Sequence, residues 1–319
     1  MSRPTPSFRV LLTDYAWPDV EIERGVLREG GAELIVAPAS DEPSLCAAAR
    51  ETDAIMTCWA KVTAAVLAAA PRCRIVSRMG IGLDNIDLAA CAQRGIAVTN
   101  VPDYCRHEVA EHTLALVLAL VRNVALFHGQ TKQGVYDLPA APPMRRLAGQ
   151  TLGIVGLGGI GREVAKRALG LGMKVIAAGR SRKDSMDGVA WREPGELLAE
   201  SDFVTLHAPL NNETRHIINA AALAVMKPTA FLINTSRGGL VDHAALADAL
   251  ARNALAGAAL DVQDPEPPDL SRPPFNDERM IVTPHAAFAS EESLRELRTR
   301  AARQVVEYLQ TEWTEYIVG

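Results

Sequence analysis

The sequence predicts an α/β protein built from two doubly wound, parallel-sheet domains, and three observations predict it. Short β-branched runs alternate with Ala-rich helical stretches along the chain. This rhythm is typical of parallel sheets covered by helices on both faces. A glycine-rich turn near residue 156 stands between a strand and a helix, and 319 residues are long for one hydrophobic core.

The first hundred residues supply the strands and helices of the first predicted sheet. Each candidate strand is a short apolar run, and the Ala-rich intervals between them fit helices. The candidate strands are residues 8–12, 33–37, 54–58, 74–77 and 97–100, and two clear helices are 63–70 and 88–94.

Residues 109–126 are predicted to form one long helix that is apolar around most of its circumference. Such a helix must be buried on more than one side, at a domain junction or a subunit interface. Residues 134–149, which carry Pro and Gly, are predicted to be a surface loop.

A second alternation follows and has the six strands of a dinucleotide-binding, Rossmann-like domain. We expect this domain to span residues 101–287. Residues 1–100 and 288–319 would form a discontinuous, flavodoxin-like substrate domain that includes a final helix at 291–311. The six candidate strands are 151–155, 174–178, 203–206, 230–234, 256–262 and 280–282.

Bulk composition excludes several classes of function. The net charge of -5 and the pI near 5.9 argue against nucleic acid as a partner. The longest apolar stretch, 114–121, is too short for a membrane span, and the first residues do not resemble a signal peptide. Five scattered cysteines form no metal-binding spacing, so we expect no metal and a reduced, cytoplasmic protein.

The segment GLGGIG at 156–161 matches the dinucleotide fingerprint in its proper context, after an apolar strand and before a helix. The first glycine would allow the tight turn, the second would let backbone amides approach a pyrophosphate, and the third would let helix and strand pack. The helix N-terminus would add positive potential for the phosphates. The predicted contacts are Gly156, Gly158, Gly159, Ile160 and Gly161.

The end of the next strand bears on which nicotinamide cofactor is used. NAD sites usually place an acid about 20 residues beyond the glycines, but this chain has Arg180, Ser181 and Arg182 there. These side chains could hold a 2′-phosphate. NADP(H) is therefore favoured, NAD(H) is possible, and a solvated basic loop is the alternative.

Three polar residues follow three strands of the predicted nucleotide domain. Arg237, Glu266 and His285 would meet at the carboxyl edge of the sheet, where ligands of open α/β sheets bind. Each alone could be structural, as a strand cap, a loop charge or a buried histidine. Together they offer a cation, a carboxylate and an imidazole that titrates near neutrality.

The chain resembles the D-isomer-specific 2-hydroxyacid dehydrogenases over nearly its whole length. The motifs that carry the resemblance are ordered as in that family: SRMGIGLDNID at 77–87, VTNVP at 98–102, EVAEH at 108–112, the glycine loop, HAPL at 207–210, and the segments around Arg237, Glu266 and 283–285. The resemblance implies hydride transfer between NAD(P)H and a small 2-oxo acid in an interdomain cleft. It also suggests a homodimer built through the helix at 109–126.

The resemblance further assigns roles to single residues. His285 would protonate the carbonyl oxygen, Glu266 would orient His285, and Arg237 would bind the substrate carboxylate and polarise the carbonyl. The cofactor would also contact His207, Pro209, Thr214, Thr235, Ser236 and Asp261. The substrate would contact Trp59, Ala60, Gly80 and Ile81 as well as Arg237.

Substrate identity is less constrained. The segment around Trp59 and Ala60 leaves Lys61 as the one cation where phosphoglycerate dehydrogenases carry arginines. Glyoxylate or hydroxypyruvate, as in the NADPH-using reductases of this family, is the predicted substrate. Two alternatives remain open: a phosphoglycerate dehydrogenase-like enzyme, and a nucleotide-sensing binding protein of the C-terminal-binding corepressor type.

Overall fold

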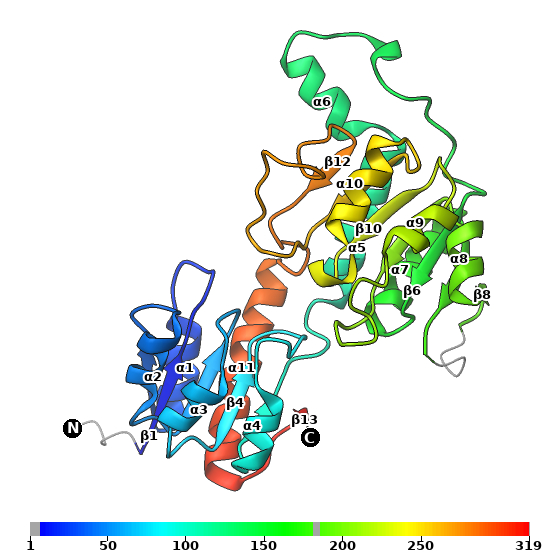
Figure 1. Cartoon of the computed structure of the whole chain (residues 1–319). Helices are drawn as coiled ribbons and strands as arrows, with labels where there is room; N and C mark the ends of the chain where they lie inside the picture. The colour runs from blue at the N-terminus through cyan, green and yellow to red at the C-terminus, as the bar shows by residue number, and fades with distance from the viewer. Residues whose placement is uncertain (1–6, 181–185, 319) are drawn as a thin grey trace. The chain divides into compact units, whose positions relative to one another are not determined.

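A computed structural model describes residues 7–180 and 186–318 of the chain (Figure 1). The chain divides into two compact units. One combines the chain up to Tyr104 with the segment from Ser290, and the other spans Cys105–Ala289. The predicted boundaries near residues 100 and 287 lie close to these divisions, and their assignment to substrate and cofactor stays a prediction.

The first unit contains a six-stranded sheet in the order β13-β5-β4-β3-β1-β2. Its first five strands are parallel and have a flavodoxin-like order. The strands are β1 (Phe8–Leu12), β2 (Ala32–Val36), β3 (Ala54–Thr57), β4 (Ile75–Arg78), β5 (Ala97–Thr99) and β13 (Ile317–Val318). The helices are α1 (Glu21–Glu29), α2 (Glu42–Ala49), α3 (Ala64–Ala69), α4 (Leu88–Gln93) and α11 (Glu291–Thr311).

The second unit contains a seven-stranded parallel sheet in the order β12-β11-β10-β9-β6-β7-β8. The order reverses between β6 and β9, which is the topological switch point of a Rossmann sheet. The strands are β6 (Thr151–Val155), β7 (Lys174–Ala178), β8 (Val189–Trp191), β9 (Phe203–Leu206), β10 (Phe231–Asn234), β11 (Gly257–Leu260) and β12 (Met280–Val282).

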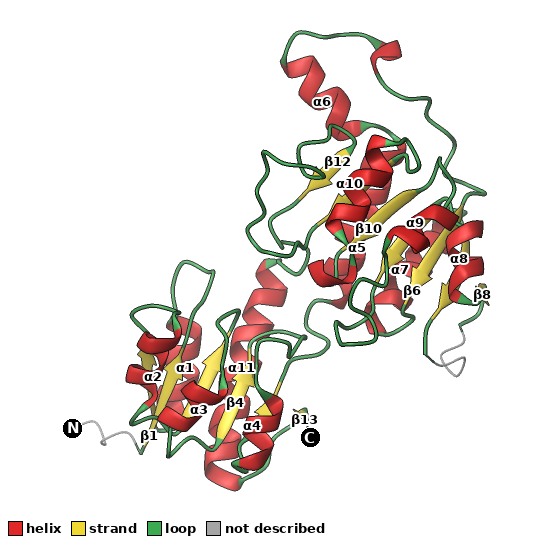
Figure 2. Ribbon diagram, viewed as in Figure 1, coloured by secondary structure: helices red, strands yellow, loops and turns green. Residues whose placement is uncertain are grey.

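Helices cover both faces of this second sheet (Figure 2). Alternate residues of β7 enter two separate apolar clusters, with Val175 packing in the cluster of α5 and α7 and Ile176 in that of α8, α9 and α10. The predicted fold class, two parallel-sheet α/β domains, is confirmed. The helices are α5 (Arg106–Val121), α6 (Val124–Lys132), α7 (Gly159–Gly170), α8 (Pro194–Glu200), α9 (Ala220–Val225) and α10 (His243–Ala251).

One secondary-structure prediction was wrong, and two short strands were missed. The helix predicted over 109–126 is two helices, α5 and α6, which bend by 63°. The break occurs because Asn123 takes a left-handed conformation with φ of 51°, a geometry that Asn tolerates better than most residues. The short strands β8 and β13 were not predicted, since two or three residues carry no readable alternation. β13 pairs antiparallel with β5.

No single helix within 7–180 and 186–318 is long and apolar enough to cross a bilayer. The bent pair of α5 and α6 passes the same length and composition test only when its two helices are joined.

Candidate active site

The glycine turn between β6 and α7 has the geometry that its sequence predicts. Gly156 has φ of 98°, a conformation that disfavours side chains. A Cβ on Gly161 would lie 2.2 Å from the Gly156 carbonyl oxygen, so the third glycine is required for helix and strand to pack. A Cβ on Gly158 would meet no atom within 4 Å. The second glycine therefore borders open space, next to the N-terminus of α7.

Several features at this turn fit a bound dinucleotide. The Nε atom of Arg106 is buried and has no hydrogen-bond partner in the described structure, and it lies 2.7 Å from the Cβ position of Gly159. A cation beside the positive end of a helix is favourable only with an anion nearby. The Nε2 atom of His207, just after β9, is also buried without a partner among the described residues. Burial lowers the pKa of His207 to about 4, so this ring is neutral at pH 7.

The predicted 2′-phosphate segment follows β7 next to the glycine turn. A Cβ on Gly179 would lie 3.9 Å from the Cα of Gly156, and Arg180 is exposed immediately after it. Arg180 is thus near the turn and open to solvent. Ser181 and Arg182 lie outside the described residues, and Ile160 is half-buried in the first turn of α7.

The remaining predicted cofactor residues after β9 form a compact loop. The Thr214 hydroxyl donates to the Pro209 carbonyl oxygen over 2.6 Å and accepts from the Asn211 N–H over 2.9 Å. Pro209 is exposed and Thr214 is half-buried. The side chain of Thr214 therefore stabilises this loop from within.

Three further predicted cofactor residues use their side chains inside the protein. The Ser236 hydroxyl donates to the Ala208 carbonyl oxygen over 2.8 Å, and the Thr235 hydroxyl lies 2.8 Å from that of Thr113 on α5. Asp261 is fully buried. Its carboxylate accepts hydrogen bonds from the Thr283 hydroxyl and from the N–H groups of Ala286 and Ala287.

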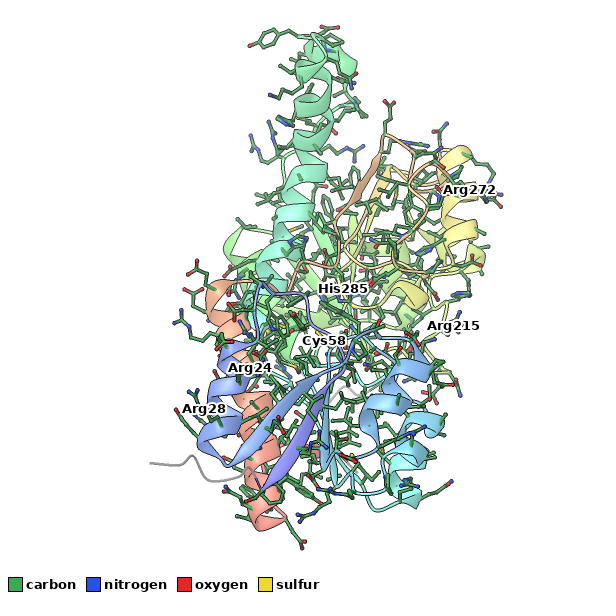
Figure 3. All side chains as sticks on the ribbon, turned by 90° about the vertical axis from the view of Figure 1, so that its left-hand side faces the viewer. Arg24, Arg28, Cys58, Arg215, Arg272 and His285 are labelled. Carbon is green, nitrogen blue, oxygen red and sulfur yellow. The ribbon has the colours of Figure 1, made fainter. Side chains whose placement is uncertain are left out.

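Arg237, Glu266 and His285 belong to loops that pack against one another. His285 Nδ1 lies 2.9 Å from Glu266 Oε2, and Glu266 Oε1 accepts from the Gln263 N–H over 2.8 Å (Figure 3 labels His285). A Cβ on Gly238 would lie 2.0 Å from the Gln263 carbonyl carbon. Only glycine beside Arg237 therefore allows its loop to approach the Glu266 loop this closely. The Arg237 guanidinium donates to the Ser236 carbonyl oxygen over 2.8 Å.

The electrostatics of this cluster keep Glu266 ionised. Burial alone would raise the pKa of Glu266, but the hydrogen bond and charge of His285, the Gln263 N–H and the charge of Arg237 together hold it below its usual value. A carboxyl group with a lowered pKa stabilises the fold above its ordinary pKa, and this contribution is lost as the pH falls through the lowered value. At neutral pH, Glu266 is thus a charged acceptor that fixes His285 through Nδ1.

The predicted substrate residues lie in loops of the first unit. Trp59 is 37% exposed and its N–H donates to Asp14 over 2.7 Å, while Ala60 is buried. The Gly80 N–H donates to the Arg78 carbonyl oxygen over 2.9 Å, so this amide is already used. The Ile81 N–H has no hydrogen-bond partner within the described part of the chain. Of the two amides predicted to bind a carboxylate, Ile81 is the better candidate.

Sequence reasoning missed several residues that lie near predicted site residues of their own unit. Arg78 is buried at the end of β4, and its guanidinium lies where a Cβ on Gly80 would clash. Arg106 borders the glycine turn, and its place as the first residue of the apolar helix α5 could have drawn attention to it. His112 was not among the predicted site residues, yet its Nε2 lies 3.1 Å from the Thr283 hydroxyl. Pairing between distant segments of this kind has no signal in a single sequence.

Comparison with known proteins defines the class. Residues 114–287 match the model of the D-isomer specific 2-hydroxyacid dehydrogenase NAD-binding domain. The chain is 39% identical to a glyoxylate reductase of Aeropyrum pernix, covering 84% of this chain and 83% of that protein. It is 37% identical to a hydroxypyruvate reductase of Thermotoga maritima, covering 78% and 82% respectively. The chain therefore belongs to the D-isomer specific 2-hydroxyacid dehydrogenase family, a class of oxidoreductases.

The chain is also 36% identical to a D-3-phosphoglycerate dehydrogenase of Methanocaldococcus jannaschii. This alignment covers 98% of the present chain but only 59% of that protein. Among solved structures, a glyoxylate reductase of Paecilomyes thermophila aligns with a TM-score of 0.88 and 28% identity over 98% of both chains. An acyclic imino acid reductase in complex with NADPH and D-Arg aligns with a TM-score of 0.87 and 26% identity, covering 98% of this chain and 100% of that one.

Proposed function

We propose that this protein reduces a small, unphosphorylated 2-oxo acid of the glyoxylate or hydroxypyruvate kind to the corresponding 2-hydroxy acid, which has the D configuration where it is chiral. The single observation that carries the proposal is the cluster of Arg237, Glu266 and His285 at the carboxyl edge of a Rossmann sheet. The names of the Aeropyrum pernix and Thermotoga maritima relatives support this substrate class.

Each residue of the cluster has a role in this reaction. When bound, the reduced nicotinamide supplies the hydride to the carbonyl carbon. His285 holds Glu266 through Nδ1, so the proton that it gives to the carbonyl oxygen is the one on Nε2. Arg237 binds the substrate carboxylate and polarises the carbonyl with its fork of donors. Glu266 keeps the ring of His285 in one orientation.

Absorbance assays of cofactor oxidation and reduction distinguish the proposed reductase from two alternatives. A phosphoglycerate dehydrogenase would oxidise 3-phosphoglycerate with NAD(P)+ as the hydride acceptor. The phosphate of that substrate requires several cations, whereas the cation that the segment around Trp59 offers is the exposed Lys61. A corepressor-type binding protein would bind nicotinamide dinucleotides with no turnover. Rapid turnover of glyoxylate or hydroxypyruvate, with none of 3-phosphoglycerate, supports the proposed reductase.

We further propose that NADP(H) is preferred over NAD(H). Arg180 supports this preference because it is exposed directly after β7, where an NAD site usually has an acid. Ser181 and Arg182 would complete the phosphate contacts. The NADPH in the imino acid reductase structure is compatible with this preference but belongs to that protein.

Arg180→Ala should weaken NADPH binding by roughly 10- to 100-fold, the scale of a charged hydrogen bond, and leave NADH binding almost unchanged. Fluorescence titration of each cofactor measures this difference. Arg272→Ala is the matched control, since Arg272 is an exposed arginine of the same unit that pairs with Asp269. Equal weakening of both cofactors by Arg180→Ala would contradict the proposed 2′-phosphate contact.

A pair of glycine substitutions tests the dinucleotide turn. Gly158→Ala adds a methyl group to open space, so its melting temperature should stay near that of the parent while cofactor affinity falls. Gly161→Ala places a methyl group against the Gly156 carbonyl oxygen. It should lower stability by roughly 1–3 kcal/mol as well as weaken the cofactor. Calorimetry with and without NADPH measures both effects, and full affinity in Gly158→Ala would exclude this turn as the phosphate site.

We propose that the protein is a homodimer, and helix α6 supports this. None of the residues of α6 is buried, and an isolated helix of this length is unstable in water. Figure 1 shows α6 and the loop after it extending away from the sheet of their unit. Large apolar side chains are exposed along this arm: Val124, Val135, Tyr136 and Leu138.

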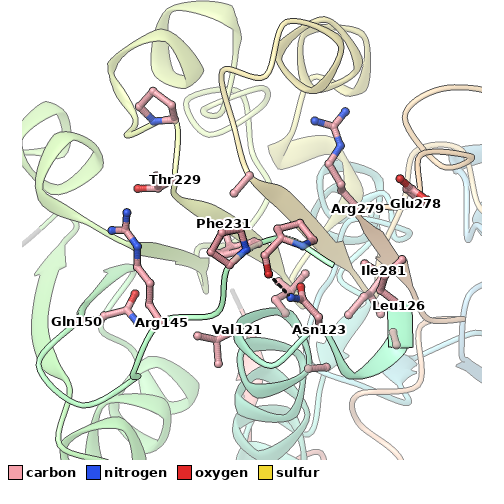
Figure 4. A pocket seen from close by; sticks show the side chains of 17 residues that line it. Val121, Asn123, Leu126, Arg145, Gln150, Thr229, Phe231, Glu278, Arg279 and Ile281 are labelled. Carbon is pink, nitrogen blue, oxygen red and sulfur yellow. Dashed lines mark hydrogen bonds between the residues drawn. The ribbon is translucent and has the colours of Figure 1, made fainter. Parts of the chain in front are cut away.

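A cavity of about 290 Å³ lies at the base of this arm, where β10 and β12 begin (Figure 4). Its walls include Val121, Phe231 and Ile281. Asn123 and Pro142 also line the cavity, and the side-chain amide of Asn123 donates a hydrogen bond to the Pro142 carbonyl oxygen over 2.9 Å. A second copy of the same arm would cover both the cavity and α6. We also propose a cytoplasmic location. Cys46, Cys58, Cys73 and Cys91 support it, because none of these four forms a disulfide among the described residues.

Replacement of Tyr136 and Leu138 by Asp should convert a dimer to a monomer, because burying two added carboxylates is costly. Sedimentation at micromolar concentration measures the mass. Leu270→Asp, at another exposed apolar position of the same unit, should leave the dimer intact. A parent protein that sediments as a monomer would refute this arrangement.

A further inference from the structure

Helix α5 contacts two of the loops that carry the candidate catalytic residues. His112 and Thr113 are consecutive residues of α5, so their side chains point roughly 100° apart. His112 Nε2 lies 3.1 Å from the Thr283 hydroxyl, in the loop before His285. The Thr113 hydroxyl lies 2.8 Å from that of Thr235, in the loop before Arg237.

The protons of the first contact can be assigned from donor and acceptor capacity. Thr283 has one hydroxyl proton and donates it to Asp261 Oδ1 over 2.6 Å. Its oxygen must then accept from His112, so His112 carries a proton on Nε2. The same nitrogen lies 3.6 Å from Asp261 Oδ1. His112 thus stabilises the buried carboxylate both through Thr283 and directly by its dipole or charge.

Asp261 in turn holds the backbone around His285. Its carbonyl oxygen accepts the His285 N–H over 2.8 Å, and its carboxylate accepts the N–H groups of Ala286 and Ala287, each over 2.9 Å. His285 has φ of 53°, in the left-handed region that is unfavourable for a non-glycine residue. The hydrogen bonds from three successive N–H groups to Asp261 stabilise this backbone conformation, which directs the imidazole of His285 toward Glu266.

The second contact has an equally definite direction. The Thr113 hydroxyl donates to the Val109 carbonyl oxygen over 2.7 Å, so Thr235 must donate its own proton to Thr113. Both hydroxyl groups are buried. Strands β10 and β12 lie on either side of β11 in the sheet. Helix α5 makes one hydrogen bond to the loop after β10 and one to the loop after β12.

We propose that His112 and Thr113 are positioning residues that set the separation of Arg237 and His285, with His112 acting through Thr283 and Asp261. This inference rests on the proposed function for its effect on turnover. The expected effect on the loops is independent of the proposed function, because these hydrogen bonds form within the protein without substrate or cofactor. Asp261, predicted to contact the cofactor, then acts mainly as the clamp of the His285 loop.

The test compares His112→Phe, which removes the donor, with His112→Gln, which keeps an N–H donor. His112→Phe should lower kcat by about 10- to 100-fold, the cost of a small misplacement of reacting groups, with the KM for cofactor changed less than about twofold. His112→Gln should restore most of the loss. His107→Phe is the matched control, because His107 is an exposed histidine of the same helix.

Hydrogen–deuterium exchange at Ala286 and Ala287 gives the readout that is independent of activity. Exchange should be faster in His112→Phe and close to the parent in His112→Gln. Unchanged exchange and unchanged kcat in His112→Phe would overturn the proposal, and so would a Gln variant as impaired as the Phe variant. If the parent protein reduces no 2-oxo acid while exchange responds as expected, the proposed function fails and the positioning network stands.

Discussion

His285→Ala should reduce kcat for 2-oxo acid reduction by at least about 100-fold, the usual scale for losing a general acid. His285 is the group whose Nδ1 is held by Glu266 at 2.9 Å, so the variant removes the proton donor and leaves the glycine turn untouched. Cofactor dissociation constants should therefore stay within about twofold of the parent. Stopped-flow measurement of cofactor oxidation separates this chemical step from product release.

Glu266→Gln tests the contribution of the carboxylate charge beside His285. The amide oxygen can still accept from His285 Nδ1, but the charge that stabilises a protonated imidazole is lost. We expect a measurable decrease in kcat that is smaller than the decrease in His285→Ala. An His285→Ala enzyme with substantial activity would mean that another group protonates the substrate.

Arg237→Ala should lower kcat/KM by roughly 100- to 1000-fold, as expected when a donor to the developing oxyanion is removed. The Arg237 loop is held by Asn234, whose side-chain amide donates to the Arg237 carbonyl oxygen over 2.8 Å. The backbone should therefore stay in place when the side chain is shortened. Steady-state kinetics with the 2-oxo acid as the varied substrate measures the change.

Arg237→Lys distinguishes charge from geometry at the same position. Lysine keeps the positive charge but lacks the planar fork that binds a carboxylate with two hydrogen bonds. Most of the loss should remain in this variant, with a raised KM for the 2-oxo acid. A lysine variant with the kcat/KM of the parent would show that only the charge matters and would contradict the bidentate role.

Most strands of both sheets could be predicted because they are short, largely apolar runs that are buried on both faces, as in β3 and β9. The turn at Gly156 could be predicted because its glycines stand between such a strand and a helix. The break at Asn123 could not, because the apolar pattern continues across it and only the left-handed backbone of one residue interrupts the helix.

The same contrast holds for the candidate site. Arg237, Glu266 and His285 each follow a strand in the same sheet, so their approach follows from topology. The engagement of Asp261 by three successive residues, and the contact of His112 with Thr283, depend on how α5 crosses the sheet. One sequence carries no record of such crossings, so these partners emerge only from the structure.

The most direct test of the central claim is cofactor oxidation, followed by absorbance, with glyoxylate or hydroxypyruvate and with NADPH and NADH in parallel. Rapid oxidation of NADPH, with slower oxidation of NADH, is the result that we predict. Faster oxidation of NADH would keep the reductase and remove the role of Arg180. Binding of either cofactor without oxidation, across a series of 2-oxo acids of increasing size, would contradict the proposed activity.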